Sequence, residues 1–460
     1  MDLPTPSART PGITALTNGF RDGSDSPVAA LARTMAQANA SQPVLNAFTA
    51  FDPSAEEAAQ QSADRWARGA EIGPLDGMPI SIKDNIHAMG MPSRYGSRST
   101  PDAPDTFDSP SVARLREAGA VIFGKTTLPE FAHKITTDSP LTGITRNPWD
   151  LTRTPGGSSG GASAAMAGGI GAAAIGTDGG GSIRVPCAWT GLFGLKPSFG
   201  RVPHHPRGPF AMLSHVGPMT RCVADARLLM EALARPDVAD WFALPEGAEG
   251  RRMPERGVTG LRIALSPQLG LPDQVEPDIA ATVRHVADLL SDGGAQLTEA
   301  NPPLVAEATQ LHGVLWSSFC YRVLSKMSAE ARDAVDPTLT ELADLGATIT
   351  RDHVVEAIIA RGEIGHAANR FFSDHDILIA PVTATVAPEI DGPGRPRPGF
   401  TQWSNHTGFP AASIPAGLTS AGLPIGVQII GPRFSDALVL DVCDWLEARL
   451  PVMPEAPHVF

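Results

Sequence analysis

Short apolar runs alternate with stretches of helical spacing along most of the chain. Each run lies between glycine, proline or polar residues, which is typical of a buried strand. Between the runs, apolar residues return every three or four positions, as on a helix that buries one face; 278–291 is a clear example. Strands interleaved with helices predict an α/β fold with a mixed sheet. The predicted strands are 78–82, 120–123, 172–175, 261–266, 377–380 and 425–430.

Two of the predicted helices begin with residues that favour a helix start. Ser26 can cap a helix whose first residue is Pro27, because its hydroxyl accepts a hydrogen bond from the first turn and proline has no N–H to lose. Ser54, with Glu57 three residues later, resembles a capping box and predicts a surface helix over 54–69.

The chain is expected to form one domain. A polar, proline-rich segment at 234–257 changes the character of the sequence, but strand and helix patterns continue after it, and no repeat of 20 to 50 residues is present. Residues 1–25 are expected to form a loose arm. The predicted division of the single domain 1–460 is an N-terminal arm and helix at 1–60, a core at 75–226, and the remaining sheet and helices at 257–460.

Composition excludes several classes of protein. Hydrophobic residues make up 42% of the chain and charged residues 18%, which favours a large core over disorder. The formal net charge of −13 disfavours a nucleic-acid partner, because both molecules are negative. The N-terminus lacks the pattern of a secretion signal, and the apolar stretch 162–176 is shorter than the ~20 residues that span a bilayer. We therefore expect a cytoplasmic protein without a membrane partner.

Cysteine and histidine placement predicts neither a metal site nor a cofactor. The four cysteines are widely spread and none forms a CxxC pair, so we expect free, mostly buried thiols. His204 and His205 lie among prolines and are interpreted as part of a loop.

Two glycine-rich matches to nucleotide-binding motifs are interpreted as coincidences. Residues 119–126 fit the phosphate-loop spacing, but the residues between the glycines are apolar, as in a core strand. Residues 169–174 fit G-x-G-x-x-A, but they follow a predicted helix and open a predicted strand, the reverse of a dinucleotide site. Neither match predicts a nucleotide cofactor.

A third glycine-rich region, 155–161 together with 176–184, is predicted to form functional loops. Its composition alone resembles a flexible linker. However, an apolar, alanine-rich helix and strand join the two segments, and large apolar residues follow the second. Burying glycine costs backbone entropy, and what it allows in return is a close approach of the backbone to a small molecule.

Ser182 is the candidate nucleophile of these loops. It follows Gly179, Gly180 and Gly181, whose N–H groups can converge on the oxyanion that forms when a hydroxyl attacks a carbonyl. No histidine has an evident role, so a histidine triad is not indicated. Lys83 ends an apolar strand, where burial would lower the pKa of its amine and let it accept a proton. The alternative for Lys83 is an ordinary surface lysine at a strand end.

Five blocks in order resemble the amidase signature family. The resemblance extends from about residue 46 to the C-terminus and is densest over 75–226, where Ser158 and Ser182 have the spacing of that family's two serines. It implies the amidase signature fold, a twisted mixed sheet covered by helices on both faces. The blocks are LDGMPISIKDNI, GAVIFGKTTLPEF, the run from GGSSGG to FGRVP, GPMTRCVADA and GLPIGVQIIG.

The resemblance implies a role for each reactive residue. Ser182 would attack the carbonyl carbon and form an acyl-enzyme. Ser158 would carry the proton between Ser182 and Lys83, and Lys83 would be the base. In the family the second serine follows a cis peptide bond, here Gly157–Ser158.

Ser159, Asp178 and Arg184 match supporting positions of the family, and we expect Asp178 and Arg184 to brace the oxyanion loop. Gly179 departs from the family, in which many members carry a bulkier residue. This difference would loosen or widen the turn without removing an N–H.

The substrate pocket is less clearly marked. Residues 203–213 resemble a proline-rich flap beside the entrance, with Phe210 and Met212 supplying apolar contacts; a plain surface loop is the alternative. Phe131 and Trp316 are further candidates for the wall, although a tryptophan at helical spacing is more often core than pocket.

An apolar pocket favours aryl or alkyl acylamides as small-molecule substrates. Carbamates and some esters are expected as well, because their carbonyl carbons are attacked in the same way. The alternative within the family is the glutaminase component of a transfer-RNA-dependent amidotransferase, which works with partner proteins near nucleic acid. The acidic balance of this chain argues against that alternative. The sequence does not indicate an oligomeric state.

Overall fold

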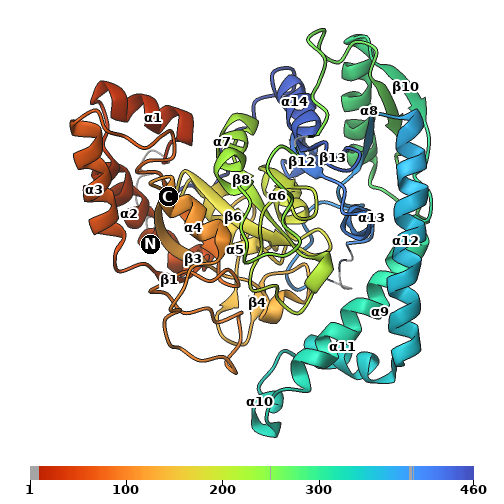
Figure 1. The fold of residues 1–460 in the computed structure, drawn as a ribbon, viewed down its shortest axis with the longest axis horizontal. Helices are drawn as coiled ribbons and strands as arrows, with labels where there is room; N and C mark the ends of the chain where they lie inside the picture. The colour runs from red at the N-terminus through yellow and green to blue at the C-terminus, as the bar shows by residue number, and fades with distance from the viewer. Residues whose placement is uncertain (1–9, 249, 393–395, 397) are drawn as a thin grey trace.

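One large mixed sheet runs through the computed structural model, which describes residues 10–248, 250–392, 396 and 398–460 (Figure 1). Its strands are β1 Phe48–Phe51, β2 Pro79–Lys83, β3 Val121–Thr126, β6 Ala173–Asp178, β7 Phe193–Lys196, β8 His215–Thr220, β9 Arg262–Leu265, β10 Gln296–Glu299, β11 Ile377–Pro381, β12 Ala411–Leu418 and β13 Pro424–Ile430. Among the described residues these 11 strands follow the order β1-β3-β2-β6-β8-β7-β12-β13-β11-β9-β10. A small hairpin, β4 Asp138–Ser139 and β5 Gly143–Ile144, lies apart from the sheet.

Helices surround this sheet (Figure 1). They are α1 Ile13–Asp22, α2 Pro27–Leu45, α3 Ala55–Ala67, α4 Pro110–Glu117, α5 Gly160–Ala167, α6 Arg184–Thr190, α7 Val223–Leu233, α8 Pro277–Asp292, α9 Val305–Leu324, α10 Ala329–Asp333, α11 Pro337–Thr348, α12 Arg351–Asp374, α13 Gly399–Thr407 and α14 Asp436–Glu447, with short 3₁₀ turns η1 Glu130–Ala132 and η2 Ala211–Leu213. No helix in the described part of the chain is both long and apolar enough to cross a bilayer.

Both faces of the sheet are buried under helices. In β11, Ile377 and Ile379 belong to a core shared with α1, α4, α7, α8 and α14. Leu378 and Ala380 belong to a second core shared with α9, α12 and α13. Because successive side chains of a strand point to opposite faces, this alternation places the two sets of helices on opposite sides of the sheet. The predicted α/β architecture with a mixed sheet is confirmed.

The predicted strands are all present, whereas β1, β7, β8, β10 and β12 were not predicted. Two of the unpredicted strands contain residues that disfavour strand prediction: Gly217 and Pro218 in β8, Pro415 and Gly417 in β12. They are strands because both neighbours in the sheet pair with them.

The helix at Ser26 starts as predicted, and the helix at Ser54 starts differently. Ser26 Oγ accepts a hydrogen bond from Ala29 N at 3.2 Å, and Pro27 is the first helical residue. Helix α3 also forms, but Ser54 Oγ donates to Asp52 Oδ1 at 2.6 Å and makes no capping bond to the helix. The predicted capping box is therefore wrong, because a preceding aspartate takes the hydroxyl.

The loose arm expected over residues 1–25 is wrong for residues 13–22, which form α1; residues 1–9 lie outside the described residues. Ile13, Leu16 and Phe20 bury one face of this helix in the main core. Asp225 of α7 accepts hydrogen bonds from the N–H groups of Ile13 and Thr14 at 3.0 and 3.1 Å. A carboxylate at the positive N-terminal end of a helix stabilises it, and this one comes from a distant part of the chain.

The local structure predicted at the two nucleotide-motif matches is confirmed. Strand β3 occupies most of 119–126 and every residue of it is buried. Gly169 and Gly171, both with positive φ, turn the chain from α5 into β6, so that match follows a helix and opens a strand.

The sheet brings the lysine segment and the glycine-rich loop to the same edge. Strand β2 lies between β3 and β6 and is parallel to both. Ile82 pairs with Ile175, so Lys83 at the end of β2 lies beside the last residues of β6. The chain then continues through 179–182 into α6.

Candidate active site

Lys83 is buried, and its amine is directed at Ser158. Its side chain has no exposed surface. Its Nζ lies 2.7 Å from Ser158 Oγ and 2.9 Å from Thr177 Oγ1. Burial lowers the pKa of Lys83 well below its ordinary value, and the negative charge of Asp178 only partly opposes this effect. The expectation of a desolvated amine at this strand end is met, and the surface-lysine alternative is wrong.

Ser158 and Ser159 lie where the first glycine-rich loop enters α5. The Gly157–Ser158 peptide bond is cis, as the family resemblance implies. Ser159 N donates to Ser182 O at 3.2 Å, and Ser159 Oγ donates to Thr177 O at 3.2 Å. Ser159 thus joins the first loop to both ends of the second.

Ser182 opens into the same pocket as Ser158. Ser182 is 5% exposed as a residue, compared with 1% for Ser158. Both residues are described, and no hydrogen bond joins their two hydroxyls in this structure; the link from Lys83 to Ser158 is made, and the link from Ser158 to Ser182 is not.

The glycine loop before Ser182 offers fewer free donors than predicted. Gly181 has φ 127° and donates its N–H to Asp178 Oδ1 at 2.7 Å. Among the described residues, no protein group accepts a hydrogen bond from the N–H of Gly179 or Gly180, nor from that of Ser182 itself. The N–H groups available for an oxyanion are therefore those of Gly179, Gly180 and Ser182, while Gly181 holds the loop in shape.

Asp178 and Arg184 form a buried ion pair under this loop. Arg184 Nε and Nη2 each lie 2.9 Å from an oxygen of Asp178, and both side chains are fully buried. Burial alone would raise the pKa of Asp178, but the charge and hydrogen bonds of Arg184 outweigh it and hold that pKa far below its ordinary range. Asp178 also accepts from Ile183 N at 3.2 Å.

Residues distant in the sequence complete the hydrogen-bond network around Asp178 and Arg184, and the sequence analysis did not predict them. Arg184 Nη1 donates to Ser404 Oγ and Gln428 Oε1, each at 2.7 Å. Asn405 Oδ1 accepts from Arg184 Nη2 at 2.7 Å, and Asn405 Nδ2 donates to the backbone O of Asp178 at 3.0 Å and of Leu213 at 3.1 Å. A polar cluster in α13 was the available signal, but nothing local connects it with 178–184.

Arg184→Met is expected to destabilise the protein by about 3–5 kcal/mol, because it leaves the Asp178 carboxylate buried without its charge partner. Urea unfolding followed by circular dichroism measures the change. Arg351→Met is a matched control, since Arg351 pairs with Asp352 at the surface with 90% of its side chain exposed. A free energy of unfolding for Arg184→Met within about 1 kcal/mol of the parent would contradict the expected effect.

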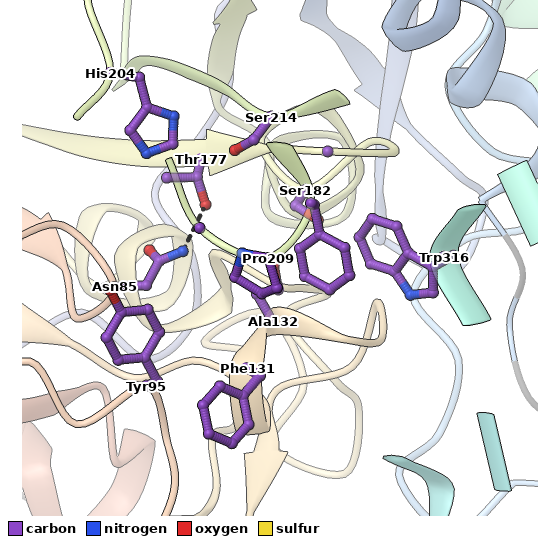
Figure 2. A pocket seen from close by; sticks show the side chains of 14 residues that line it. Asn85, Tyr95, Phe131, Ala132, Thr177, Ser182, His204, Pro209, Ser214 and Trp316 are labelled. Atoms are coloured by element: carbon purple, nitrogen blue, oxygen red, sulfur yellow. Dashed lines mark hydrogen bonds between the residues drawn. The ribbon is translucent and has the colours of Figure 1, made fainter. Parts of the chain in front are cut away.

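The pocket above the serines has aromatic walls (Figure 2). Of the predicted wall residues, Phe131, Phe210 and Trp316 line it. The rings of Phe210 and Trp316 are stacked, with centroids 3.6 Å apart and planes 9° apart. The remaining lining residues are Asn85, Tyr95, Ala132, Thr177, Gly179, His204, Gly208, Pro209 and Ser214.

Trp316 explains the glycine at position 179. A Cβ built on Gly179 would lie 3.2 Å from Trp316 Cζ3, closer than most side-chain contacts allow. Trp316 is held there by a hydrogen bond from Nε1 to His133 O at 2.8 Å. The space that a side chain at 179 would use is thus filled by a ring from α9.

Met212 is not among the described residues that line the pocket, so its predicted contact is wrong. It lies in the turn η2, where the chain curls after Phe210 and does not keep the alternation of a strand. His204, interpreted from the sequence as part of a plain loop, does line the pocket. Burial lowers the pKa of His204 to about 3, with a further contribution from Arg207.

Comparison with known proteins identifies the family. The family model described as Amidase matches residues 29–440. The chain belongs to the amidase signature family. This amidase is 35% identical over 436 residues to an acylamidase of Rhodococcus erythropolis, with 91% of each chain covered. A solved bacterial aryl acylamidase of the amidase signature family superposes with a TM-score of 0.85 and 28% identity, covering 96% of both chains.

A relative with a different role is almost as similar. A glutamyl-tRNA(Gln) amidotransferase component from Symbiobacterium thermophilum is 34% identical over 457 residues, covering 90% of this chain and 91% of that one. Family membership makes the present protein an amide C–N hydrolase. It does not identify the substrate, which has to be inferred from the residues of the pocket.

Proposed function

We propose that this amidase hydrolyses aryl and alkyl acylamides, and also carbamates and some esters, through an acyl-enzyme on Ser182. The observation that carries the proposal is the 2.7 Å contact between Lys83 Nζ and Ser158 Oγ, inside a wholly buried environment that opens at Ser182. Burial lowers the pKa of the amine, so it loses its proton at a lower pH than an exposed lysine and can act as the base that a hydroxyl needs to become a nucleophile.

The proposed reaction moves one proton along the three residues. Neutral Lys83 takes the proton of Ser158 as Ser158 takes that of Ser182, and Ser182 Oγ bonds to the carbonyl carbon. The N–H groups of Gly179, Gly180 and Ser182 hold the oxyanion. The C–N bond then breaks as Ser158 returns a proton to the leaving nitrogen. Water attacks the acyl-enzyme by the same route and releases the acid; a carbamate ends as an amine, an alcohol and carbon dioxide.

The pocket favours an apolar substrate over glutamine. Glutamine carries a carboxylate and an ammonium group that a binding site must pair. The described residues lining the pocket include no Asp, Glu, Lys or Arg. Phe131, Phe210 and Trp316 instead offer flat apolar surface, which suits an aryl or alkyl group. The acylamidase names of two relatives support the same choice, and the glutaminase of an amidotransferase remains the alternative.

A substrate panel tests the proposal. The purified single chain is expected to hydrolyse a nitroanilide, an anilide and an aryl carbamate, and to release no ammonia from glutamine. Product absorbance and an ammonia assay give the rates. Hydrolysis of glutamine without hydrolysis of the anilides would favour the glutaminase role over acylamide hydrolysis.

A further inference from the structure

Three residues form a second hydrogen-bonded chain that ends at the pocket. Asp105 Oδ1 lies 2.9 Å from His87 Nδ1, and His87 Nε2 lies 2.9 Å from the hydroxyl of Tyr95. Tyr95 lines the pocket and its ring is stacked on that of Phe131, with centroids 6.0 Å apart. The mechanism proposed above uses none of these three groups.

The carboxylate of Asp105 determines which atoms of these three residues carry a hydrogen. Asp105 also accepts from Ser93 Oγ at 2.7 Å and from Lys125 Nζ at 3.1 Å. Burial opposes ionisation of Asp105, but these donors and His87 together lower its pKa, so it is a carboxylate and can only accept. His87 Nδ1 therefore donates to Asp105, and in the tautomer that carries its one ring hydrogen there, Nε2 accepts the hydrogen of Tyr95.

The one hydrogen of the Tyr95 hydroxyl is thus turned toward His87, which leaves the lone pairs of its oxygen as acceptors. Burial raises the pKa of Tyr95 to about 12, so the hydroxyl stays protonated, and its one hydrogen is held by His87. Asn85 lies beside Tyr95 on the side of the pocket across from Trp316 (Figure 2). Its Nδ2 donates to Thr177 Oγ1 at 3.3 Å, and its Oδ1 has no hydrogen-bond partner among the described residues. On this side of the pocket, the oxygen of Tyr95 is therefore the acceptor available to a bound molecule.

We propose that Tyr95 binds the N–H of the scissile amide or carbamate, so that the enzyme selects substrates with an N–H over the corresponding esters. The inference rests on the proposed function. An ester oxygen has no hydrogen to give, and it would face the lone pairs of Tyr95. When the nitrogen becomes tetrahedral, an N–H held by Tyr95 leaves the nitrogen lone pair free to take the proton from Ser158. Tyr95 is a substrate-binding residue, and His87 and Asp105 position it.

Tyr95→Phe tests this selection with two substrates that share one acyl group, a 4-nitroanilide and a 4-nitrophenyl ester. The variant keeps the ring that stacks on Phe131 and loses only the oxygen. We expect kcat/KM for the anilide to fall about 10- to 100-fold and kcat/KM for the ester to stay within a factor of about three. An N-methyl anilide, which lacks the N–H, should respond like the ester. Equal losses on all three substrates, or no loss on the anilide, would overturn the proposal.

His87→Leu tests the positioning role. Leucine cannot accept the hydrogen of Tyr95, which is then free to turn toward the pocket, so the ratio of anilide to ester turnover should fall while the ester rate is kept. His285→Leu, on the exposed side of α8, is the matched control and should leave the ratio unchanged. A parent enzyme that hydrolyses neither substrate would refute the proposed function itself, whereas an unchanged ratio in both Tyr95→Phe and His87→Leu would refute only the role of Tyr95.

Discussion

Ser182→Ala is expected to lower kcat for an anilide by about 10⁴-fold or more and to abolish covalent labelling by a serine-directed phosphonofluoridate. The loss is large because the variant lacks the atom that would form the acyl bond, while the base and the oxyanion donors remain without a nucleophile to assist. Initial rates give the change in kcat, and mass spectrometry of the peptide that contains residue 182 reports the label.

A buried serine outside the pocket provides the control for this variant. Ser413 in β12 is fully buried, and its hydroxyl has no hydrogen-bond partner among the described residues. Ser413→Ala should keep both the rate and the label. If Ser182→Ala still acquires one equivalent of label at another serine, the nucleophile has been assigned to the wrong residue.

Lys83→Met is expected to lose a comparable factor in kcat, about 10⁴-fold, without losing stability. In the parent, activity should fall as the pH drops through the lowered pKa of Lys83, because the protonated amine cannot accept a proton. The pKa of Lys83 is about 10.4 in the unfolded chain and lower in the folded protein. Between these two pKa values Lys83 is protonated in the unfolded state and neutral in the folded state. Stability of the parent therefore rises with pH in this window. Methionine has no proton to bind, so this pH dependence is absent in Lys83→Met. The free energy of unfolding of the variant should therefore exceed that of the parent most at the low-pH end of the window.

The measurements are the pH profile of kcat and urea unfolding at several pH values. Lys196 is a second fully buried lysine, and burial together with Arg184 lowers its pKa to about 7. It donates to the backbone oxygens of Pro197 and Phe409, away from the pocket. Lys196→Met should preserve the pH profile of the parent. A profile that flattens in Lys196→Met and survives in Lys83→Met would transfer the role of base to Lys196.

The sequence was sufficient wherever a signal is local. Apolar runs located β2, β3, β6, β11 and β13, and the loops around Ser158 and Ser182 were recognised because buried glycine beside serine is costly without a function. Lys83 was found because it ends one of those runs. The fold class followed from the alternation of strands with helices.

Contacts between distant segments could not be predicted in this way. Asn405 and Gln428 look like ordinary polar residues in the sequence, and only the folded chain brings them to Arg184. Tyr95 gains its orientation from His87 and Asp105 through the folding of a loop without regular structure. The orientation of Met212 depends on a single turn, which apolar spacing does not report.

The hydrogen-bond network around Arg184 also sets an order of events during synthesis. Arg184 and Asn405, which share a hydrogen bond, are 221 residues apart in the chain. At about 5–20 residues per second, a ribosome needs roughly 10 to 45 s to travel that distance. Throughout this interval the nascent loop holds an arginine and an aspartate whose later neighbours do not yet exist. A nascent or prematurely terminated chain that ends before α13 would thus carry all three reactive side chains and still be inert.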